Sequence, residues 1–418
     1  MEITTLEHWI AKKIGVEKLN QYDLKNYQLK KISDTVKYAA DNSGFYKNLY
    51  KNLDLHDLSW QKFSTIPFTS AADIQNHGTR MVCVEQDEIY RIVTLQTSGT
   101  TARPKKIYFT EDDHELTIDF FDNGMQILTK PQDNVLILLP AQTPGCVGDL
   151  LAKGLERFGA IPHRYGIPED FTDTLNYMLN HNIKAVVANP EHMLAMANLA
   201  EHTGQKPKLN SILLSTDFLA ESLMKQLSKT FQATVYEHYG MTETGLGGGV
   251  SCQALKGYHL RDADLYFEII NPQTGANLPD GSWGEVVFTT LTRRAMPLIR
   301  YRTGDYGRFL TEPCPCGAVL KRLDKIYHRI DNKEFRITDF DQAIFGIDGI
   351  FDYQMAVSRS EKTIAITIHT LNVDRDFTDN VKKSINNLTH GYRVQINTAA
   401  GFTPQHYKLQ KRKIEYIN

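Results

Sequence analysis

The sequence predicts an α/β protein. We expect a large N-terminal domain with mixed and parallel sheets and a β-rich subdomain, followed by a small α+β C-terminal domain. Three observations lead to this expectation: the chain length, an alternation of short apolar segments with longer mixed ones, and a change of pattern after Gly257. The chain has 418 residues, more than one hydrophobic core usually holds, so two domains of unequal size are expected.

The first predicted element is a helix within residues 24–49. Apolar side chains recur there at helical spacing, and Ile32, Val36, Ala39 and Ala40 fall near one face. Much of this segment is therefore expected to form an amphipathic helix.

From residue 134 onward, short apolar segments alternate with longer segments of mixed polarity. The predicted strands are Val135–Leu139, Ala185–Ala188, Ile212–Leu214 and Val235–Tyr236. The predicted helices are Gly148–Phe158, Phe171–Asn180, Met193–His202 and Ala220–Thr230. Strands that alternate with helices favour a parallel sheet built from strand–helix–strand units.

Further along the chain the pattern becomes richer in strands. Leu265–Ile270 and Glu285–Thr290 are strand-like and are separated by turn-forming residues, which predicts a β-rich subdomain. Alternating β and α patterns then return in Ile364–His369, Thr378–Leu388 and Arg393–Thr398. A boundary near Arg329–Asp331 divides the chain into domains of residues 1–330 and 331–418.

The composition narrows the class of protein. The net charge is −2 at pH 7, and a chain without an excess of basic residues is not expected to bind nucleic acid. Residues 1–16 lack the apolar core of a secretory signal, and the apolar segment Asn134–Pro140 is too short to cross a bilayer. We therefore expect a cytoplasmic enzyme without a membrane partner, and a homodimer is an open alternative.

Five cysteines are too few and too scattered for a disulfide framework. Six residues separate Cys252 from His259, and Cys314 and Cys316 form a tight Cys–Pro–Cys–Gly turn further along the chain. Three thiolates and one imidazole make a complete tetrahedral ligand set for structural zinc. The alternative is a set of separate, reduced cysteines and a hydrogen-bonded histidine. The remaining two, Cys83 and Cys146, are expected to be structural.

A loop rich in hydroxyl groups follows the predicted strand Ile92–Leu95. It contains Thr97, Ser98, Gly99, Thr100 and Thr101, and Pro104 and Lys105 come soon after. The N–H and hydroxyl groups of such a loop can surround phosphate oxygens, and Lys105 can add positive charge. We therefore expect a phosphate-binding loop, with a surface turn as the alternative.

This loop resembles the phosphate loop of the adenylate-forming superfamily of acyl-CoA synthetases, peptide-synthetase adenylation domains and luciferases. Ala102 replaces the last glycine of the family pattern. Two further segments, Tyr239–Glu243 (YGMTE) and Tyr301–Asp305 (YRTGD), resemble the family's other two signatures and follow in the same order. The phenylacetate-CoA ligases look most similar, and the resemblance extends from about residue 25 to about residue 331.

The resemblance implies roles for the residues at the motif positions. Tyr239, followed by Gly240, would stack on adenine, and Thr242 would contact the α-phosphate. Glu243 would hold Mg²⁺, which prefers oxygen ligands. Asp305 would accept hydrogen bonds from both ribose hydroxyls, a task that suits a carboxylate.

The resemblance also implies a mobile C-terminal domain. Arg329 would reach the ribose or the phosphates, and Asp331 would be the hinge. The catalytic lysine would be Lys408, whose ammonium would stabilise charge between the carboxylate and the α-phosphate. Lys411 is the fallback, and a solvated basic tail is the alternative interpretation.

An acyl pocket is expected at glycine-rich segments. Its candidate residues are Gly145, Gly245, Leu246 and Gly247. Some phenylacetate-CoA ligase relatives also carry a cysteine and histidine pattern similar to the one described above, which favours zinc.

The function implied is that of an AMP-forming acyl- or aryl-CoA ligase, with ATP, Mg²⁺ and coenzyme A as ligands and a small, favourably aromatic, carboxylic acid as substrate. Phe335–Phe345 lacks the glycine and proline of the family loop that frames thiol entry. Transfer to the pantetheine of an acyl carrier protein, or to an amine, therefore stays open. A third alternative, motivated by Ala102, is a weakly active nucleotide-binding regulatory protein.

Overall fold

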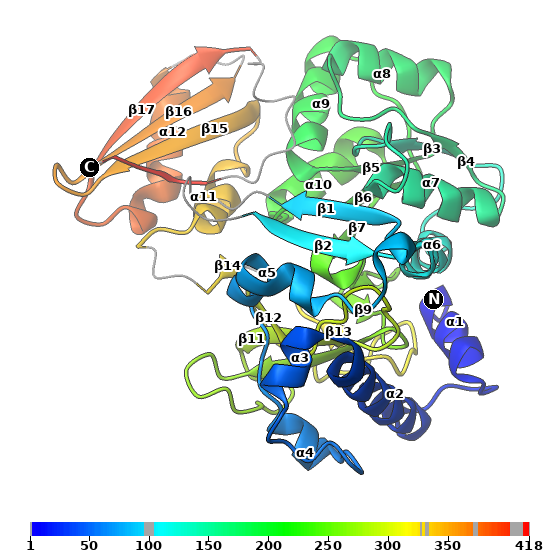
Figure 1. Cartoon of the computed structure of the whole chain (residues 1–418). Helices are drawn as coiled ribbons and strands as arrows, with labels where there is room; N and C mark the ends of the chain where they lie inside the picture. Colours follow the sequence, from blue (N-terminus) through cyan, green and yellow to red (C-terminus); the bar gives the residue numbers. More distant parts are fainter. Residues whose placement is uncertain are drawn as a thin grey trace. The chain divides into compact units, whose positions relative to one another are not determined.

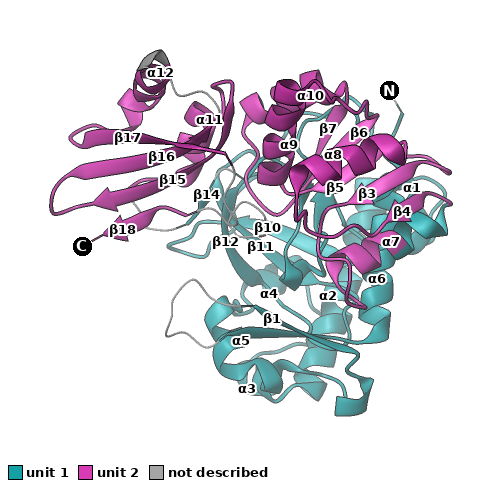
Figure 2. Ribbon diagram, turned by 90° about the horizontal axis from the view of Figure 1, so that it is seen from above, with its two compact units in different colours: residues 1–127, 153–158, 238–330 teal, residues 128–152, 159–237, 331–418 magenta. Residues whose placement is uncertain are grey.

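The structure, a computed structural model, describes residues 2–95, 104–326, 328–330, 334–370, 375–401 and 413–417. The helices and strands are labelled in Figure 1, and the chain divides into two compact units, which have different colours in Figure 2. Unit 1 consists of residues 1–127, 153–158 and 238–330, and unit 2 of residues 128–152, 159–237 and 331–418. Within the described ranges, no helix is long and apolar enough to span a bilayer.

The helices that lie entirely within unit 1 all precede residue 127, except η3. They are α1 Thr5–Ile14, α2 Gln21–Asn42, α3 Gly44–Leu49, α4 Trp60–Ser64, α5 Ala71–His77, η1 Gly78–Met81, η2 Gln86–Glu88, α6 Glu111–Met125 and the later η3 Thr242–Thr244. The helix predicted within residues 24–49 is confirmed, but it is broken at Ser43. Ser43 is extended (φ −108°, ψ 124°), and its hydroxyl accepts a hydrogen bond from the N–H of Tyr46, which caps a second helix.

Unit 1 contains a four-stranded antiparallel sheet in the order β10-β11-β12-β14. Its strands are β10 Leu265–Ile270, β11 Gly284–Thr290, β12 Tyr301–Gly307 and β14 His328–Arg329. Shorter strands are β1 Arg91–Leu95, which pairs with β2 Lys105–Phe109, and β8 Gly249–Val250, β9 Tyr258–Leu260 and β13 Arg322–Leu323. The predicted β-rich subdomain is confirmed. One apolar core joins α2 and α3 to this sheet, with Ile32, Tyr46 and Phe288 fully buried.

Unit 2 contains the predicted parallel sheet, in the order β4-β3-β5-β6-β7. The strands are β4 Ile161–His163, β3 Asn134–Ile137, β5 Ala185–Ala188, β6 Ser211–Leu214 and β7 Thr234–Tyr239, whose last two residues belong to unit 1. The helices are α7 Val147–Arg157, which also ends in unit 1, α8 Phe171–Asn180, α9 Pro190–Thr203 and α10 Glu221–Phe231. All residues of β5 and β6 are buried, as expected for strands covered on both faces.

The last part of unit 2 has its own four-stranded sheet, in the order β17-β16-β15-β18. Its elements are α11 Ile337–Ile344, β15 Ile350–Ser358, β16 Thr363–Thr370, α12 Arg375–Ile385, η4 Asn386–Leu388, β17 Arg393–Ala400 and β18 Glu415–Ile417. This confirms the predicted α+β character. The alternating apolar side chains of β15, a strand that the sequence analysis did not assign, are buried.

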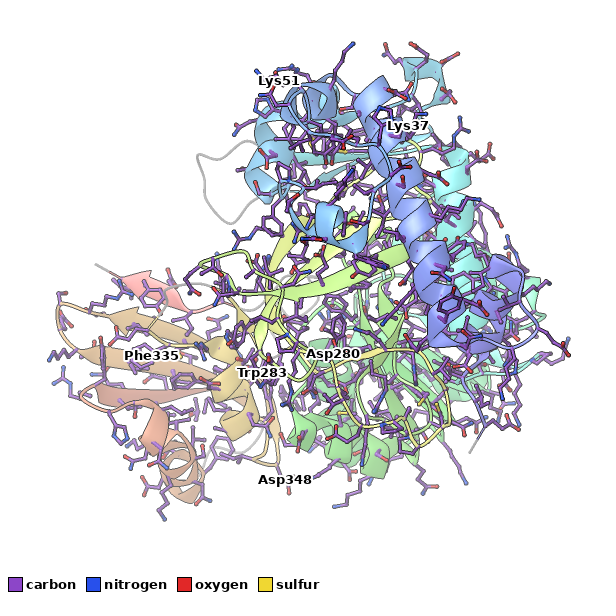
Figure 3. All side chains as sticks on the ribbon, turned by 90° about the horizontal axis from the view of Figure 1, so that it is seen from below. Lys37, Lys51, Asp280, Trp283, Phe335 and Asp348 are labelled. Atoms are coloured by element: carbon purple, nitrogen blue, oxygen red, sulfur yellow. The ribbon has the colours of Figure 1, made fainter. Side chains whose placement is uncertain are left out.

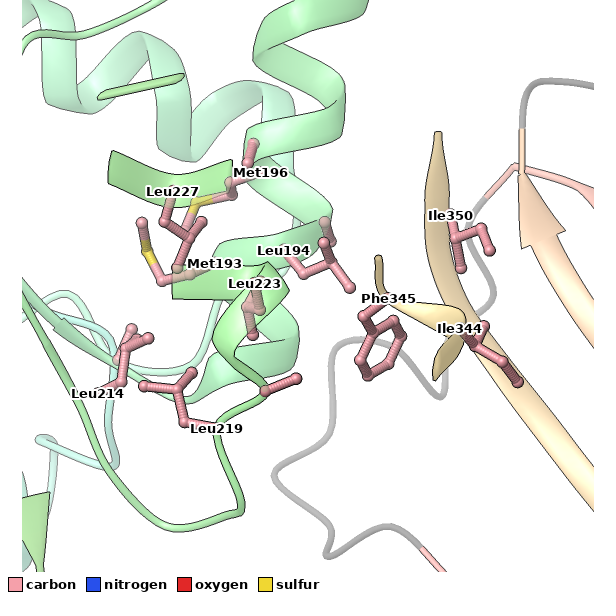
Figure 4. Close-up of a cluster of buried hydrophobic side chains, with 14 of the residues drawn as sticks. Met193, Leu194, Met196, Leu214, Leu219, Leu223, Leu227, Ile344, Phe345 and Ile350 are labelled. Carbon is pink, nitrogen blue, oxygen red and sulfur yellow. The ribbon is translucent and has the colours of Figure 1, made fainter. Parts of the chain in front are cut away.

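The two parts of unit 2 share one hydrophobic core (Figure 4). Leu194 on α9 and Leu223 on α10 are buried in the same cluster as Phe345 and Ile350. The Nδ2 of Asn198 also donates a hydrogen bond to the carbonyl oxygen of Ile350, at 2.7 Å. Residues 334–370 are therefore packed against the helices of the parallel sheet by apolar side chains.

Candidate active site

The structure describes some of the predicted site residues and not others. The hydroxyl-rich loop, Thr97, Ser98, Gly99, Thr100 and Thr101, lies outside the described residues. The hinge candidate Asp331 and the lysine candidates Lys408 and Lys411 also lie outside them. The assignments of these residues stay predictions.

Glu243 lies at the centre of a buried polar cluster in unit 1. The short helix η3 follows β7 and carries Thr242 and Glu243. The Nζ of Lys105, the first residue of β2, forms an ion pair with the Oε1 of Glu243. The hydroxyl of Tyr301, at the start of β12, donates to the same oxygen at 3.2 Å. Three segments far apart in the sequence thus meet at one carboxylate.

The surroundings of Glu243 favour its charged form. Burial alone would raise the pKa of Glu243, but the charge of Lys105 and its hydrogen bond outweigh burial and hold the pKa below its usual value. Burial, followed by the nearby Glu243 charge, raises the pKa of Tyr301, so its hydroxyl keeps the proton that it donates. The cluster is a buried anion held by one cation and one neutral donor.

Arg293 is a further member of this cluster that the sequence analysis did not identify. Its Nη1 donates to the carbonyl oxygen of Glu243 at 2.7 Å. Burial lowers the pKa of Arg293 to about 10. No sequence signal distinguishes Arg293 from Arg294 beside it, because only the fold buries one of them. Tyr301 lies in a recognised motif, but the motif alone does not reveal its contact with Glu243.

Asp305 lies on an irregular part of β12. The pairing of β11 with β12 shifts between Glu285 and Val287, and Gly304 has a φ of +74°. This left-handed conformation strains any residue with a side chain, and an added Cβ would lie 3.0 Å from the Nη2 of Arg329. The segment Tyr301–Asp305 therefore forms part of a bulged strand, which carries Asp305.

Tyr239 and Arg329 both contact the Asp305 carboxylate. The Tyr239 hydroxyl donates to Oδ2 at 2.9 Å, and the Nε of Arg329 lies 3.4 Å from Oδ1. Asp305 pairs with Arg329 across β12 and β14. Burial first, and then the Asp305 charge, raises the pKa of Tyr239 well above its ordinary value. The Tyr239 hydroxyl therefore stays protonated and holds the carboxylate that was predicted to bind ribose.

The candidate acyl-pocket residues fall in both units. Gly245, Leu246 and Gly247 follow η3 in unit 1, and Gly145 precedes α7 in unit 2, where its N–H donates to the Oδ2 of Asp149 at 2.8 Å. Gly247 packs tightly, because an added Cβ would lie 2.4 Å from the ring of Phe120 on α6. Glycine is therefore required there by the close approach of an aromatic ring.

The four predicted zinc ligands come together in unit 1. Cys252 follows β8, His259 lies on β9, and Cys314 and Cys316 lie on a turn before β13. Their ligand atoms all lie within 4.8 Å of one another. The Sγ atoms of Cys252 and Cys314 are 3.6 Å apart, and the Sγ of Cys316 is 3.4 Å from the Nε2 of His259.

These distances fit a tetrahedral metal site. With Zn–S bonds of about 2.3 Å, neighbouring ligand atoms in a tetrahedron lie about 3.5–3.8 Å apart. A disulfide would require sulfur atoms about 2.05 Å apart, so Cys252 and Cys314 are not bonded to each other. Burial alone would raise the pKa of the Cys316 thiol, but its hydrogen bond to His259 lowers it to about 6. The donor set and its spacing therefore suit zinc.

The structure is an α/β fold in which Glu243 and Asp305, from two segments that resemble family signatures, are buried carboxylates with bound partners. Residues 27–291 match the AMP-binding enzyme family, and the chain belongs to this family. The predicted membership of the adenylate-forming superfamily is thereby confirmed.

Characterised relatives have the same type of activity as the one predicted. The chain is 28% identical over 342 residues to a phenylacetate-coenzyme A ligase of Aromatoleum evansii, covering 76% of this chain and 73% of the relative. A phenylacetate-coenzyme A ligase of Pseudomonas putida is 26% identical over 321 residues, covering 74% of this chain and 71% of the relative. These relatives confirm the prediction of an AMP-forming CoA ligase similar to the phenylacetate-CoA ligases.

A solved structure shows the shared fold. The crystal structure of a 2-hydroxyisobutyryl-CoA ligase in its postadenylation state superposes with a TM-score of 0.78 at 18% identity. The match covers 93% of this chain and 88% of that chain. The predicted fold class is confirmed over both units.

Proposed function

We propose that this chain activates a small aromatic carboxylic acid with ATP, forms the acyl-adenylate with release of pyrophosphate, and transfers the acyl group to coenzyme A. The observation that carries the proposal is the buried Glu243 carboxylate, held by Lys105 and Tyr301; Lys105 and Glu243 lie within the region that matches the AMP-binding enzyme family. The names of the phenylacetate-CoA ligase relatives support the aromatic acid and the thioester product. The cytoplasmic location expected from the sequence belongs to the same proposal.

The chemical problem is to bring two anions together. A carboxylate resists nucleophiles, and attack on the α-phosphate of ATP gives it a far better leaving group, AMP. Glu243 would hold Mg²⁺, which supplies positive charge at the phosphates. In this structure the Lys105 ammonium balances the Glu243 charge. When Mg²⁺ is bound, it would replace the Lys105 ammonium at the Glu243 carboxylate. The remaining task is to position both anions and to exclude water.

Asp305 would bind the ribose in this proposal. A carboxylate can accept several hydrogen bonds, so the Tyr239 hydroxyl can hold Asp305 in place while ribose hydroxyls donate to it as well. Arg329, with its guanidinium beside Asp305, would face the same part of the nucleotide. The expected contacts of Gly240 and Thr242, of the hydroxyl-rich loop and of Lys408 complete the proposed site.

A different acceptor is the second candidate. Residues 337–344, where the phenylacetate-CoA ligase pattern has a glycine- and proline-containing loop, form the helix α11, and Phe340 and Ile344 are buried. Because this segment differs from the family loop, the pantetheine of an acyl carrier protein, or an amine, is an alternative acceptor to free coenzyme A. Structural zinc at the cluster of Cys252, His259, Cys314 and Cys316 is part of the proposal for either acceptor.

The test is ATP–pyrophosphate exchange with a panel of acids, followed by an acceptor assay. Phenylacetate and benzoate should support faster exchange than acetate or 2-hydroxyisobutyrate. Coenzyme A should then be acylated in the presence of ATP and the best acid. Exchange with no acid in the panel would overturn the enzymatic proposal and favour a regulatory nucleotide-binding protein. Exchange without acylation of coenzyme A would favour the carrier protein or the amine.

A further inference from the structure

Unit 1 contains a cavity of about 300 Å³ that shares no lining residue with the Glu243 and Asp305 clusters. It lies among α2, the α4 segment, β9, β10 and the segment before β13. The residues that matter for its chemistry are Gln28, Trp60, Phe63, Asp262, Tyr266 and Lys321. Its volume is at the lower end of the range of small-molecule pockets.

The unusual member of this lining is Asp262. Its side chain is buried, with only 5% of the residue exposed, and its Oδ2 accepts no hydrogen bond from any described residue. Other buried carboxylates of unit 1 are satisfied: Asp264 is paired with Arg261, and Glu268 is paired with Arg300. Buried polar atoms are nearly always hydrogen-bonded, so an exception at a cavity wall indicates a missing partner.

The charge balance around Asp262 explains what that partner must supply. Burial raises the pKa of Asp262 to about 7, although Lys321 and Gln28 oppose the rise. The Nζ of Lys321 already pairs with Asp280, 2.9 Å away, and lies 4.5 Å from the ring centroid of Phe309. Asp280, which is labelled in Figure 3, belongs to the connection between β10 and β11. Lys321 is therefore shared with Asp280, and the Asp262 carboxylate forms no ion pair of its own with a described residue.

Aromatic rings form one wall of the cavity. The ring centroids of Trp60 and Tyr266 lie 5.0 Å apart, and Phe63 lies 5.8 Å from Tyr266 and 6.5 Å from Trp60. Aromatic faces attract cations, and the combination of a ring cluster with one buried carboxylate is suited to an ammonium group. The negative charge of Asp262 would, in contrast, repel an anionic acid.

We propose that this cavity binds a small amine, with its ammonium group on Asp262 and its apolar body against Trp60, Phe63 and Tyr266. The site is separate from the proposed acyl-adenylate chemistry and needs neither ATP nor Mg²⁺. The inference therefore stands or falls independently of the proposed function.

The test is isothermal titration of the full-length protein with phenethylamine and with 2-phenylethanol, its neutral analogue. Phenethylamine should bind at least about tenfold more tightly, because its ammonium group can donate a charged hydrogen bond to the carboxylate and the alcohol cannot. Asp262→Asn should remove this preference, whereas Asp41→Asn, on the exposed face of α2, should keep it. Trp60→Ala should weaken the binding of both compounds.

A pH series gives a second readout. The amine keeps its proton between pH 6 and 8, as a lysine side chain does in water, so tighter binding at pH 8 would report ionisation of Asp262. Lys321 and Tyr266 on β10 act electrostatically with Asp262, and Lys25 on α2 is the other charged residue that lines the cavity.

Three results would overturn the proposal: no binding of phenethylamine at millimolar concentration, equal binding of the amine and the alcohol, or unchanged amine binding by a folded Asp262→Asn variant. Unfolding curves of each variant would show whether it is folded. Because no nucleotide is present in these titrations, ligase activity does not affect any of the outcomes.

Discussion

Two kinds of carboxylate pair are buried in unit 1. Glu268 is bound by Arg300 through two nitrogens, with distances of 3.0 and 3.2 Å, a fixed planar arrangement that suits a structural role. Glu243 is bound by Lys105, whose flexible stem ends in a single ammonium group. A lysine can leave a carboxylate more easily than a two-pronged arginine can, so Glu243 is the carboxylate better suited to exchange partners during a reaction.

The role of Glu243 can be tested by Glu243→Gln. The amide keeps the shape but removes the charge that would hold Mg²⁺ and that now pairs with Lys105. We expect ATP–pyrophosphate exchange to fall at least about tenfold, a loss of over ~1.4 kcal/mol in transition-state stabilisation. Glu312→Gln, at an exposed position, is the control. Unchanged exchange in a folded Glu243→Gln protein would remove Glu243 from the proposed site.

Asp262 should make stability depend on pH. Its pKa is about 7 in the folded protein against an ordinary value of 3.8, so the folded state keeps a proton that the unfolded state loses. Stability contributed by this group is therefore lost as pH rises from about 4 to about 7. Asp262→Asn should remove this pH-dependent loss of stability, because asparagine does not ionise.

The measurement for Asp262→Asn is the free energy of unfolding in urea. The substitution should raise the free energy of unfolding more at pH 8 than at pH 5, by about 2.5 kcal/mol. A gain that does not change with pH would contradict the raised pKa of Asp262.

Single residues could be predicted from the sequence where their chemistry is rare. Three cysteines and a histidine stand out in a chain with few cysteines, and the fold brings those four together. Arg293 and Asp262 could not be found in this way, because arginine and aspartate are common and only burial gives these two their properties.

Elements were predictable where periodicity is strong. Phe171–Asn180 and Leu265–Ile270 agree with α8 and β10 to the residue, because amphipathic and apolar patterns decide them. The break at Ser43 was not predicted, because the apolar spacing continues through it. The Ser43 hydroxyl caps a new helix there, and the apolar pattern does not reveal this cap. The bulge at Gly304 depends on pairing with β11, a non-local contact that local sequence does not encode.

The β8–β9 hairpin and the turn before β13 should depend on a metal. We expect about one zinc per chain in protein purified without added metal, measured by elemental analysis. Cys316→Ser should lower both the zinc content and the melting temperature, whereas Cys146→Ser, outside the cluster, should leave the zinc content unchanged. A metal-free protein with undiminished stability and activity would exclude the structural role.

At the scale of the whole molecule, the proposed hinge makes a prediction about the two half-reactions. Lys408→Ala should slow adenylation strongly and leave thioester formation from a supplied acyl-adenylate nearly intact, because its charge is needed where phosphate charge gathers. Asp331→Pro should instead impair thioester formation, because proline fixes φ and hinders rotation. Both variants would be measured in both half-reactions.

The outcomes separate the possible roles of these residues. Equal damage to both steps by Lys408→Ala would indicate a structural role and direct attention to Lys411. Two normal steps in Asp331→Pro would place the hinge elsewhere. The packing of Phe345 and Ile350 with Leu194 bears on this result, since rotation about residue 331 must either break that contact or move residues 128–237 together with the C-terminal part.

The shared core of unit 2 also matters while the chain is being made. Residues 128–237 leave the ribosome before residues 334–370. Leu194 and Leu223 therefore lack two of their packing partners, Phe345 and Ile350, until these are synthesised. During that interval the outer faces of α9 and α10 expose apolar side chains, which favours aggregation and binding by chaperones. A chain truncated near residue 330 and released from the ribosome would therefore contain all of unit 1 and only part of unit 2, a form that cellular quality control can recognise.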